Sequence, residues 1–389
     1  MSKGMKKVRH VKTIIVGGGV TGLMCAKELQ KNDREDFLIL TKDVGGRVTS
    51  SEKDAINYGA YFVTKDYSVL SEYISIGRKM HKRRFGFVRR GKIHSFYSVF
   101  SLIHCIPLVR VYFELRKFRR HFRAFRRRCH TLSQKEALER DAYLLRLYHK
   151  KASEEIHAFK ALALVHEYFD QLGHFMAFDY PGNSTAFTMM QWASEMLVMP
   201  MYEFRLDINA WVKTLKRKIV LTEVVEIKKR SEGYEVLTKD TTYIAKYVVC
   251  ATEPWVTRTL VGLRTKAPVL VSSHARYVRG VPKGPFAHAR WRFIMFPSSS
   301  KMISIAKQSD GNYLVHSETK DVSLDSYFSS YHVMGERTWD PAFVFAPKAL
   351  VEARHGKGLY VVGGINIEGM EDCALTGIWA ARDILLQEH

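Results

Sequence analysis

The first ordered pattern along the chain is an apolar run, then glycines, then apolar residues at helical spacing. Residues 14–16 are β-branched, which predicts a short buried strand. Leu23, Ala26 and Leu29 recur every three residues, which predicts the apolar face of a helix. A second apolar run at residues 37–40 predicts another strand. The order strand, helix, strand is typical of an α/β protein with a parallel sheet.

Later regions alternate between apolar and polar residues, as half-buried strands do. Residues 219–240 predict a hairpin with its turn at residues 231–233, and residues 243–255 predict a strand that returns to the first sheet. Residues 267–280 and 289–308 also alternate. We therefore expect a second sheet, which is antiparallel.

Residues 110–130 predict a basic amphipathic helix. Its apolar stripe contains Val111, Leu115, Phe118, Phe122, Phe125 and Cys129. The candidate residues for contact with a polyanion are Arg116, Arg119, Arg120, Arg123, Arg126 and Arg127. The uncharged segment 96–109 precedes this helix and is shorter than the roughly 20 apolar residues that cross a bilayer. It is either a buried wall of a substrate cavity or a segment that dips into a membrane.

Composition changes this picture through its charge. The 389 residues are 46% hydrophobic, and 61 Lys and Arg against 39 Asp and Glu give a net charge of +22. Such an excess favours a polyanionic partner, which is a nucleic acid, an anionic membrane surface or an anionic substrate. The five cysteines have no paired spacing, and no histidine pattern is typical of a metal site. We therefore expect a cytoplasmic protein without a metal.

The glycines after the first strand carry the clearest chemistry. Gly17, Gly19 and Gly22 satisfy G-x-G-x-x-G between a predicted strand and a predicted helix. The first glycine allows a tight turn, the second lets the backbone approach a pyrophosphate, and the third lets helix and strand pack closely. The helix N-terminus favours the negative charge of a phosphate. The pattern predicts a dinucleotide site.

A second motif follows the second strand. A carboxylate that binds the adenosine ribose is expected there, but the counted position holds Thr41. Gly45, Gly46 and Arg47 come next. With this G-G-R the chain resembles the flavin-containing amine oxidase superfamily, which includes protoporphyrinogen oxidases and phytoene desaturases. The resemblance implies FAD as the cofactor and places Arg47 at its pyrophosphate.

The resemblance extends to the middle and the end of the chain. It implies that the backbone of Val225 holds the adenine and that Gly363 and Gly364 lie beside the flavin. Met370 is matched to the first turn of a helix that points at the flavin. The family's second carboxylate is replaced by glycine, for which Asn366 or Glu368 could substitute.

There are fewer candidates for catalysis than for cofactor binding, because this chain has no lysine at the position where many amine oxidases carry one. His274 is near that position, and Trp339 is a candidate aromatic residue at the flavin face.

The expected fold is α/β, with a Rossmann-type FAD-binding domain and a second substrate domain of helices plus antiparallel sheet. The FAD-binding domain takes residues 1–75, 205–265 and 345–389. The substrate domain takes residues 76–204 as its helical part and 266–344 as its sheet part.

Three functions fit this sequence. The first is FAD-dependent oxidation of an amine, either a small molecule or an amino group tethered to nucleic acid. The second is oxidation or desaturation of an isoprenoid or porphyrin-like substrate at a membrane surface. The third is a nucleic-acid-binding protein on a non-catalytic flavoprotein fold.

Overall fold

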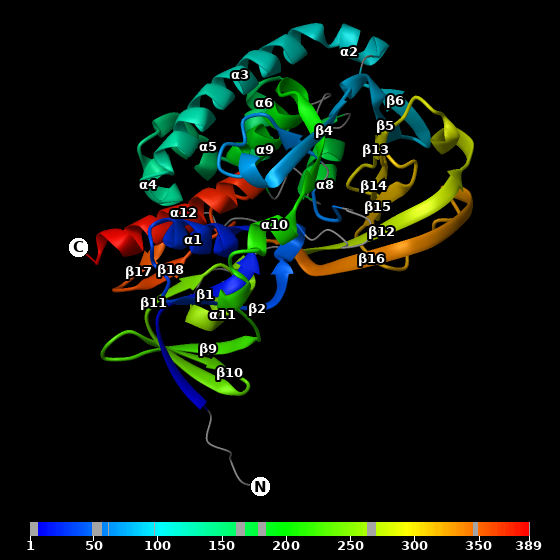
Figure 1. The fold of residues 1–389 in the computed structure, drawn as a ribbon. Coiled ribbons are helices and arrows are strands. Elements are labelled where there is room, and N and C mark those ends of the chain that lie inside the picture. Colours follow the sequence, from blue (N-terminus) through cyan, green and yellow to red (C-terminus); the bar gives the residue numbers. More distant parts are fainter. Residues whose placement is uncertain are drawn as a thin grey trace.

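The computed structural model describes residues 7–48, 57–60, 62–96, 98–160, 168–177, 184–262, 270–344 and 349–388. Figure 1 shows a parallel sheet with two helices along one face, a second sheet beside it, and a long helix across the top of the molecule. The predicted α/β fold class with a second, antiparallel sheet is therefore confirmed.

The first sheet is parallel through its centre. Its path is β17-β18-β11-β1-β2-β8, with β10 and β9 attached to β11 as an antiparallel hairpin. The strands are β1 (Lys7–Gly19), β2 (Phe37–Gly45), β8 (Ile219–Leu221), β9 (Val224–Lys229), β10 (Tyr234–Thr238), β11 (Thr241–Cys250), β17 (Arg354–His355) and β18 (Leu359–Val361). Residues 14 and 15 of the central strand are fully buried, as their apolar run predicted.

Two helices from opposite ends of the sequence cover one face of this sheet (Figure 1). They are α1 (Val20–Lys31) and α12 (Met370–Leu386), and they lie in direct contact. A Cβ atom on Gly377 of α12 would lie 2.1 Å from the carbonyl oxygen of Thr21, so glycine is needed for this approach. The short helices α10 (Ile208–Val212) and α11 (Pro254–Val261) also belong to this half of the molecule.

The second sheet has the order β16-β12-β15-β14-β13-β5-β6, and among its described strands only β13 and β5 pair in parallel. Its strands are β5 (Phe85–Arg89), β6 (Lys92–Ser95), β12 (Leu270–Pro282), β13 (Phe293–Met295), β14 (Met302–Lys307), β15 (Tyr313–Ser317) and β16 (Phe328–Val344). A small third sheet holds β3 (Val63–Thr64), β4 (Ile74–Met80) and β7 (Met201–Leu206). The expectation that residues 76–204 are mostly helical thus misses four strands, β4 to β7.

The helical part packs above these sheets. Its helices are α2 (Val99–Ile103), α3 (Cys105–Arg128), α4 (Gln134–Glu139), α5 (Ala142–His149), α6 (Ala152–Ala158), α8 (Asp170–Ala177) and α9 (Ala186–Ala193), and a π-helical turn, Ser194–Val198, follows α9. The predicted apolar stripe of α3 is buried in the main hydrophobic core. Among the described residues, no helix has both the length and the apolar composition that crossing a bilayer requires.

The division into domains stays a proposal. We propose that the first sheet with α1 and α12 forms the FAD-binding domain, because its strands come from residues 7–45, 219–250 and 354–361. The remaining elements would form the substrate domain. The predicted boundaries at residues 265 and 345 lie outside the described residues.

The predicted contact with a polyanion is wrong for two of the six arginines. Arg119 and Arg126 lie on α3 but are only 3% and 7% exposed. Arg119 pairs with Asp66, and Arg126 makes two hydrogen bonds of 2.8 Å to the carboxylate of Asp372. These partners are distant in sequence, so the spacing of the helix could not reveal them. Arg116, Arg120, Arg123 and Arg127 remain on the exposed side of the helix.

Candidate active site

A cavity of about 650 Å³ lies where the carboxyl ends of β1, β2 and β11 meet α12 and β16. Its volume is in the range of small-molecule and cofactor sites. Open α/β sheets bind ligands at this edge. The predicted cofactor residues that line it are Gly17, Gly19, Thr41, Gly45, Gly46, Arg47, Gly363, Gly364 and Met370.

The glycine loop closes one end of the cavity. Gly17 has a φ of +114°, and a Cβ there would lie 2.5 Å from the carbonyl oxygen of Ala251. Gly22 faces the strand, where a Cβ would lie 2.0 Å from the carbonyl oxygen of Gly17. Helix α1 begins at Val20 directly after the loop, and its first turn contains no acidic residue. The helix end and the glycine backbone therefore form a cradle that suits a pyrophosphate.

The loop that contains Gly45, Gly46 and Arg47 contacts the glycine loop at Gly19. A Cβ on Gly46, which has a φ of +58°, would lie 3.2 Å from the Cα of Gly19. Arg47 follows, and its Nη1 donates a hydrogen bond of 2.8 Å to the carbonyl oxygen of Ala342 on β16. The contact fixes a guanidinium at the cavity wall. A permanently charged, planar group at this place fits the pyrophosphate of FAD.

Thr41 has a local role in the structure. Its hydroxyl accepts a hydrogen bond of 3.0 Å from the Gly18 amide and donates one of 2.5 Å to the carbonyl oxygen of Asp43. The side chain thus ties the end of β2 to the glycine loop. Asp43, Glu223 and Glu253 are carboxylate residues that line the cavity.

The valine that the resemblance matches to the adenine position is not among the residues that line the cavity. Val225 is 56% exposed and does not line the cavity, whereas Val224 is buried and does. Neighbouring residues of a strand point to opposite faces, so two consecutive valines cannot both face the cavity. The structure therefore does not place Val225 at the cavity, and we propose Val224, which lines it, as the residue that adjoins the adenine.

The opposite end of the cavity is formed by the start of α12. Met370 is the first residue of that helix, as the sequence predicted. Asn366 does not replace the missing carboxylate, because its side chain exchanges hydrogen bonds of 2.8 and 2.9 Å with the Val351 backbone. Glu368 lines the cavity beside Gly364.

The histidine predicted from the sequence is not at the cavity. The Nδ1 of His274 lies 2.8 Å from the Thr338 hydroxyl, its Nε2 lies 3.4 Å from Glu336, and it is not among the lining residues. His316, on the neighbouring strand, lines the cavity instead, and Trp339 does so as predicted. Both histidines are buried in one sheet, so the sequence carried no signal that separated them.

His316 is held in its neutral form. Its Nε2 donates a hydrogen bond of 2.8 Å to the carbonyl oxygen of Tyr58. Burial, with a smaller contribution from the nearby His274, lowers the pKa of His316 to about 4. The hydrogen bond to Tyr58 raises the pKa and so opposes part of this shift. A neutral imidazole at physiological pH therefore lies in the cavity wall.

This pKa shift predicts a pH dependence of stability. The unfolded chain gains a proton at this histidine near pH 6.5, whereas the folded chain gains it near pH 4. The free energy of unfolding should therefore fall as the pH decreases between these values, by about 3 kcal/mol from this group. Urea unfolding of the wild type and of His316→Gln at several pH values measures the difference. Equal pH dependence in the two proteins would contradict this assignment.

A buried charged cluster adjoins the cavity at Glu195. This residue lies in the π-helical turn and lines the cavity, and such turns are frequent at functional sites. Its Oε1 lies 3.6 Å from Arg126. Burial raises its pKa, while Arg126 and Arg119 oppose that effect. Glu195 was missed because its acidic side chain stands in an otherwise apolar stretch of the sequence, with no motif around it.

The cluster has more carboxylates than guanidinium groups. The two guanidinium groups of Arg119 and Arg126 face Asp66, Asp372 and Glu195. Asp66 and Asp372 make the closer contacts, so Glu195 is left with the weakest pairing of the three. Of the three carboxylates, Glu195 is the one that lines the cavity.

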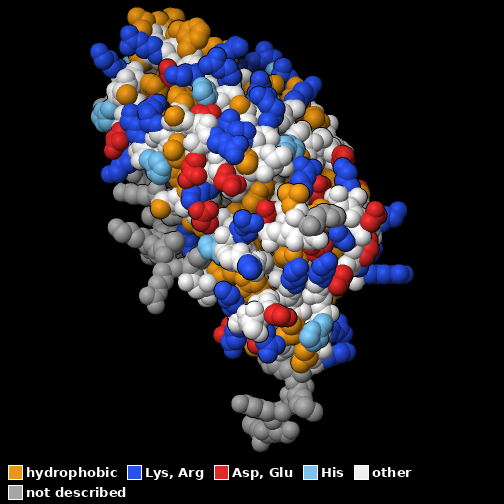
Figure 2. All heavy atoms as spheres, turned by 90° about the vertical axis from the view of Figure 1, so that its left-hand side faces the viewer, with side chains coloured by type: hydrophobic (Ala, Val, Ile, Leu, Met, Phe, Trp, Pro, Cys, Tyr) orange, Lys and Arg blue, Asp and Glu red, His pale blue; other side chains and the backbone are white. Residues whose placement is uncertain are grey.

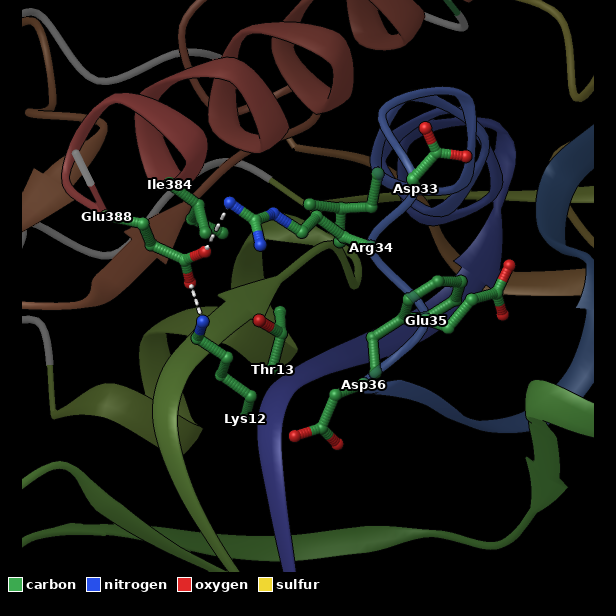
Figure 3. A pocket seen from close by; sticks show the side chains of 10 residues that line it. Lys12, Thr13, Asp33, Arg34, Glu35, Asp36, Ile384 and Glu388 are labelled. Atoms are coloured by element: carbon green, nitrogen blue, oxygen red, sulfur yellow. Dashed lines mark ion pairs between the residues drawn. The ribbon is translucent and has the colours of Figure 1, made fainter.

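A smaller hollow lies at the opposite edge of the sheet. Figure 3 shows it between the start of β1 and the end of α12. Lys12 and Arg34 pair with Glu388 at 2.9 and 3.4 Å. The hollow faces the amino ends of the strands, whereas ligands of open α/β sheets bind at the carboxyl ends, so it is not our candidate site. No cluster of three or more potential metal ligands occurs in the described ranges, and the absence of a metal stays a prediction.

Comparisons with known proteins agree with this geometry. The sequence model of the family described as "DAO: FAD dependent oxidoreductase" matches residues 12–341. No curated protein sequence matches the chain significantly.

Solved structures share the fold of this chain at low sequence identity. A putrescine oxidase with bound putrescine has a TM-score of 0.69 at 13% identity, over 97% of this chain and 100% of that chain. Cyclohexylamine oxidase from Brevibacterium oxydans IH-35A has a TM-score of 0.65 at 12% identity, over 97% and 99%. A CLA-producing fatty acid isomerase from P. acnes has a TM-score of 0.66 at 11% identity, over 100% and 99%. At these identities the similarity shows the fold.

Proposed function

The chain belongs to the FAD-dependent oxidoreductase family, and on that basis we propose that it oxidises the C–N bond of an amine. It is an enzyme whose cofactor is FAD, which supplies a hydride acceptor when it is bound. Transfer of a hydride from the α-carbon of the neutral amine would leave a protonated imine, which water hydrolyses to a carbonyl compound and ammonium. The hypothesis of a non-catalytic protein is not retained.

The residues of the cavity support a single orientation of the cofactor. We propose that the Gly17–Gly19 backbone, the start of α1 and Arg47 bind the pyrophosphate, and that Val224 adjoins the adenine. The flavin would lie toward Gly363, Gly364 and the start of α12. Glu371 and Asp372, in the first turn of α12, are not among the residues that line the cavity. Glu371 accepts a hydrogen bond of 2.9 Å from the Val69 amide, and Asp372 binds Arg126.

The observation that carries the amine proposal is the carboxylate of Glu195 in an aromatic and apolar wall. Trp192, Trp339 and Phe62 line the cavity with it. An ammonium group is attracted by this carboxylate and by aromatic faces. The raised pKa of Glu195 also makes it a better acceptor for the proton that the ammonium must lose before oxidation. The named neighbours putrescine oxidase and cyclohexylamine oxidase support the same substrate class.

We expect Glu195→Gln to weaken amine binding more than it slows chemistry. The concentration of amine that gives half-maximal flavin reduction should rise about 10-fold to 100-fold, because a charged hydrogen bond is lost. Stopped-flow absorbance with putrescine or cyclohexylamine under anaerobic conditions measures this. Glu336→Gln is the matched control, since Glu336 is exposed and does not line the cavity.

Two outcomes distinguish an error in the role of Glu195 from an error in the proposed function. If amines reduce the flavin of the wild type and of Glu195→Gln equally well, amine oxidation stands and the role of Glu195 is wrong. If no amine reduces the flavin of the wild type, the function itself is wrong.

The second candidate function is oxidation of an apolar substrate at a membrane surface. The observation that favours it is a set of exposed apolar side chains on α2 and α3. Attachment of the amine to nucleic acid is now less well supported, because two of the six arginines behind that hypothesis are internal.

A further inference from the structure

Helix α2 and the first half of α3 expose large apolar side chains to solvent. The exposed fractions are 73% for Val99, 74% for Leu102, 72% for Ile103, 66% for Ile106, 53% for Val109 and 64% for Phe113. Monomeric proteins rarely expose such a contiguous group without a binding role. In Figure 2 hydrophobic side chains gather at the top of the molecule, the end where Figure 1 places α2 and the start of α3.

The outward side of α3 changes character along its length. Ile106, Val109 and Phe113 are spaced by three and four residues, so they share one face of the helix. That face is opposite the buried stripe, whose members include Val111 and Leu115. The face that is apolar in the first half of α3 is basic in the second half.

The basic half is made of exposed cations. Arg116, Arg120, Arg123 and Arg127 line a shallow hollow along it, together with Lys117. Figure 2 shows Lys and Arg side chains directly beside the apolar group at the top of the molecule. The acidic residue of α3 is Glu114, which is half-buried. The face therefore offers an apolar end and an adjoining positive surface.

We propose that this face of α2 and α3 binds the surface of an anionic membrane, with the apolar end in the acyl boundary and the arginines at the headgroups. Helices that lie in the interface combine these two features. Each cation near an anionic leaflet adds to binding, and the effect decreases with salt. Helix α3 spans about 36 Å along the top of the molecule, so the whole face can meet a flat surface.

An anionic membrane surface accounts for both the apolar half and the basic half of this face. A nucleic acid would meet the arginines but would leave the apolar end in water. A second copy of the chain, related by two-fold symmetry, would bring the arginines against other arginines or against the apolar half, and neither contact gives them an anionic partner. The proposal does not depend on the substrate of the enzyme.

The test is co-sedimentation of the purified full-length protein with vesicles of phosphatidylcholine, with and without phosphatidylserine. The wild type should bind only the vesicles that contain phosphatidylserine. Arg116→Gln with Arg120→Gln and Arg127→Gln should weaken binding about 100-fold and make it less sensitive to salt. Leu102→Gln with Ile106→Gln and Phe113→Gln should weaken binding on the order of 10-fold or more, because apolar side chains that enter the acyl boundary are lost.

Both triple variants should keep the FAD content and the thermal midpoint of the wild type, because the substituted side chains are exposed and do not line the FAD cavity. Wild type that does not sediment with anionic vesicles at low salt would overturn the proposal. So would an apolar triple variant that binds vesicles like the wild type. Duplex DNA that binds more tightly than the vesicles, with no effect of the apolar substitutions, would identify the face as a nucleic-acid surface instead.

Discussion

Replacement of Arg126 by leucine is expected to lower the free energy of unfolding by about 3–5 kcal/mol, the range for a buried ion pair that loses one partner. Its guanidinium is buried and bound to the fully buried carboxylate of Asp372 by two hydrogen bonds of 2.8 Å. It also lies 3.6 Å from Glu195 and 4.6 Å from the centre of the Phe122 ring. Leucine would leave two buried carboxylates without their main cation. Urea unfolding of the apoprotein measures the change.

The neighbouring residue supplies the control. Arg127 is on the same helix but is exposed, so Arg127→Leu should change the free energy of unfolding by no more than about 0.5 kcal/mol. Arg126→Lys keeps the charge without the planar fork and should fall between the two. If the Arg126 and Arg127 variants unfold alike, the buried cluster is not a structural element of the fold.

Replacement of Arg47 by alanine should weaken FAD binding about 1000-fold, because truncation of one partner of a buried charge pair costs 2–5 kcal/mol. Arg47 lines the cavity and is positioned by its hydrogen bond to the Ala342 carbonyl oxygen. Titration of the apoprotein with FAD, followed by flavin fluorescence, measures the affinity. The thermal midpoint of the apoprotein shows whether the fold survives.

Arg34→Ala is the matched control for this prediction. Arg34 lines the separate hollow of Figure 3 and pairs with Glu388 at 3.4 Å. Its removal should leave FAD affinity unchanged. Equal affinity of the Arg47 variant and the wild type would show that the pyrophosphate lies elsewhere.

The cofactor end of the cavity could be predicted from sequence because local geometry determines it. A turn with positive φ at Gly17 and a close approach at Gly46 each require glycine, and these requirements leave a pattern that can be read in order. The position of Met370 in the first turn of α12 was predicted from the family resemblance, and α12 begins at this residue. The strand alternation gave the second sheet, but it could not decide between Val224 and Val225, because both are apolar.

The substrate end could not be predicted because distant segments determine it. Arg126 reaches Asp66 and Asp372, which are 60 and 246 residues away in the sequence. On α3 its position looked like part of a solvated basic face. The choice between His274 and His316 depends on the register of β12 and β15, where Ala275 and not His274 lies opposite His316. Only tertiary packing shows which side of the sheet faces the cavity.

We propose that FAD oxidises an amine in the cavity that both Arg47 and Glu195 line. Anaerobic mixing of the purified holoprotein with a panel of primary amines, including putrescine and cyclohexylamine, tests it most directly. We predict that at least one amine bleaches the visible absorbance of the flavin and that one molecule of the corresponding carbonyl compound forms for each flavin reduced. A flavin that dithionite reduces but that no amine reduces would contradict it.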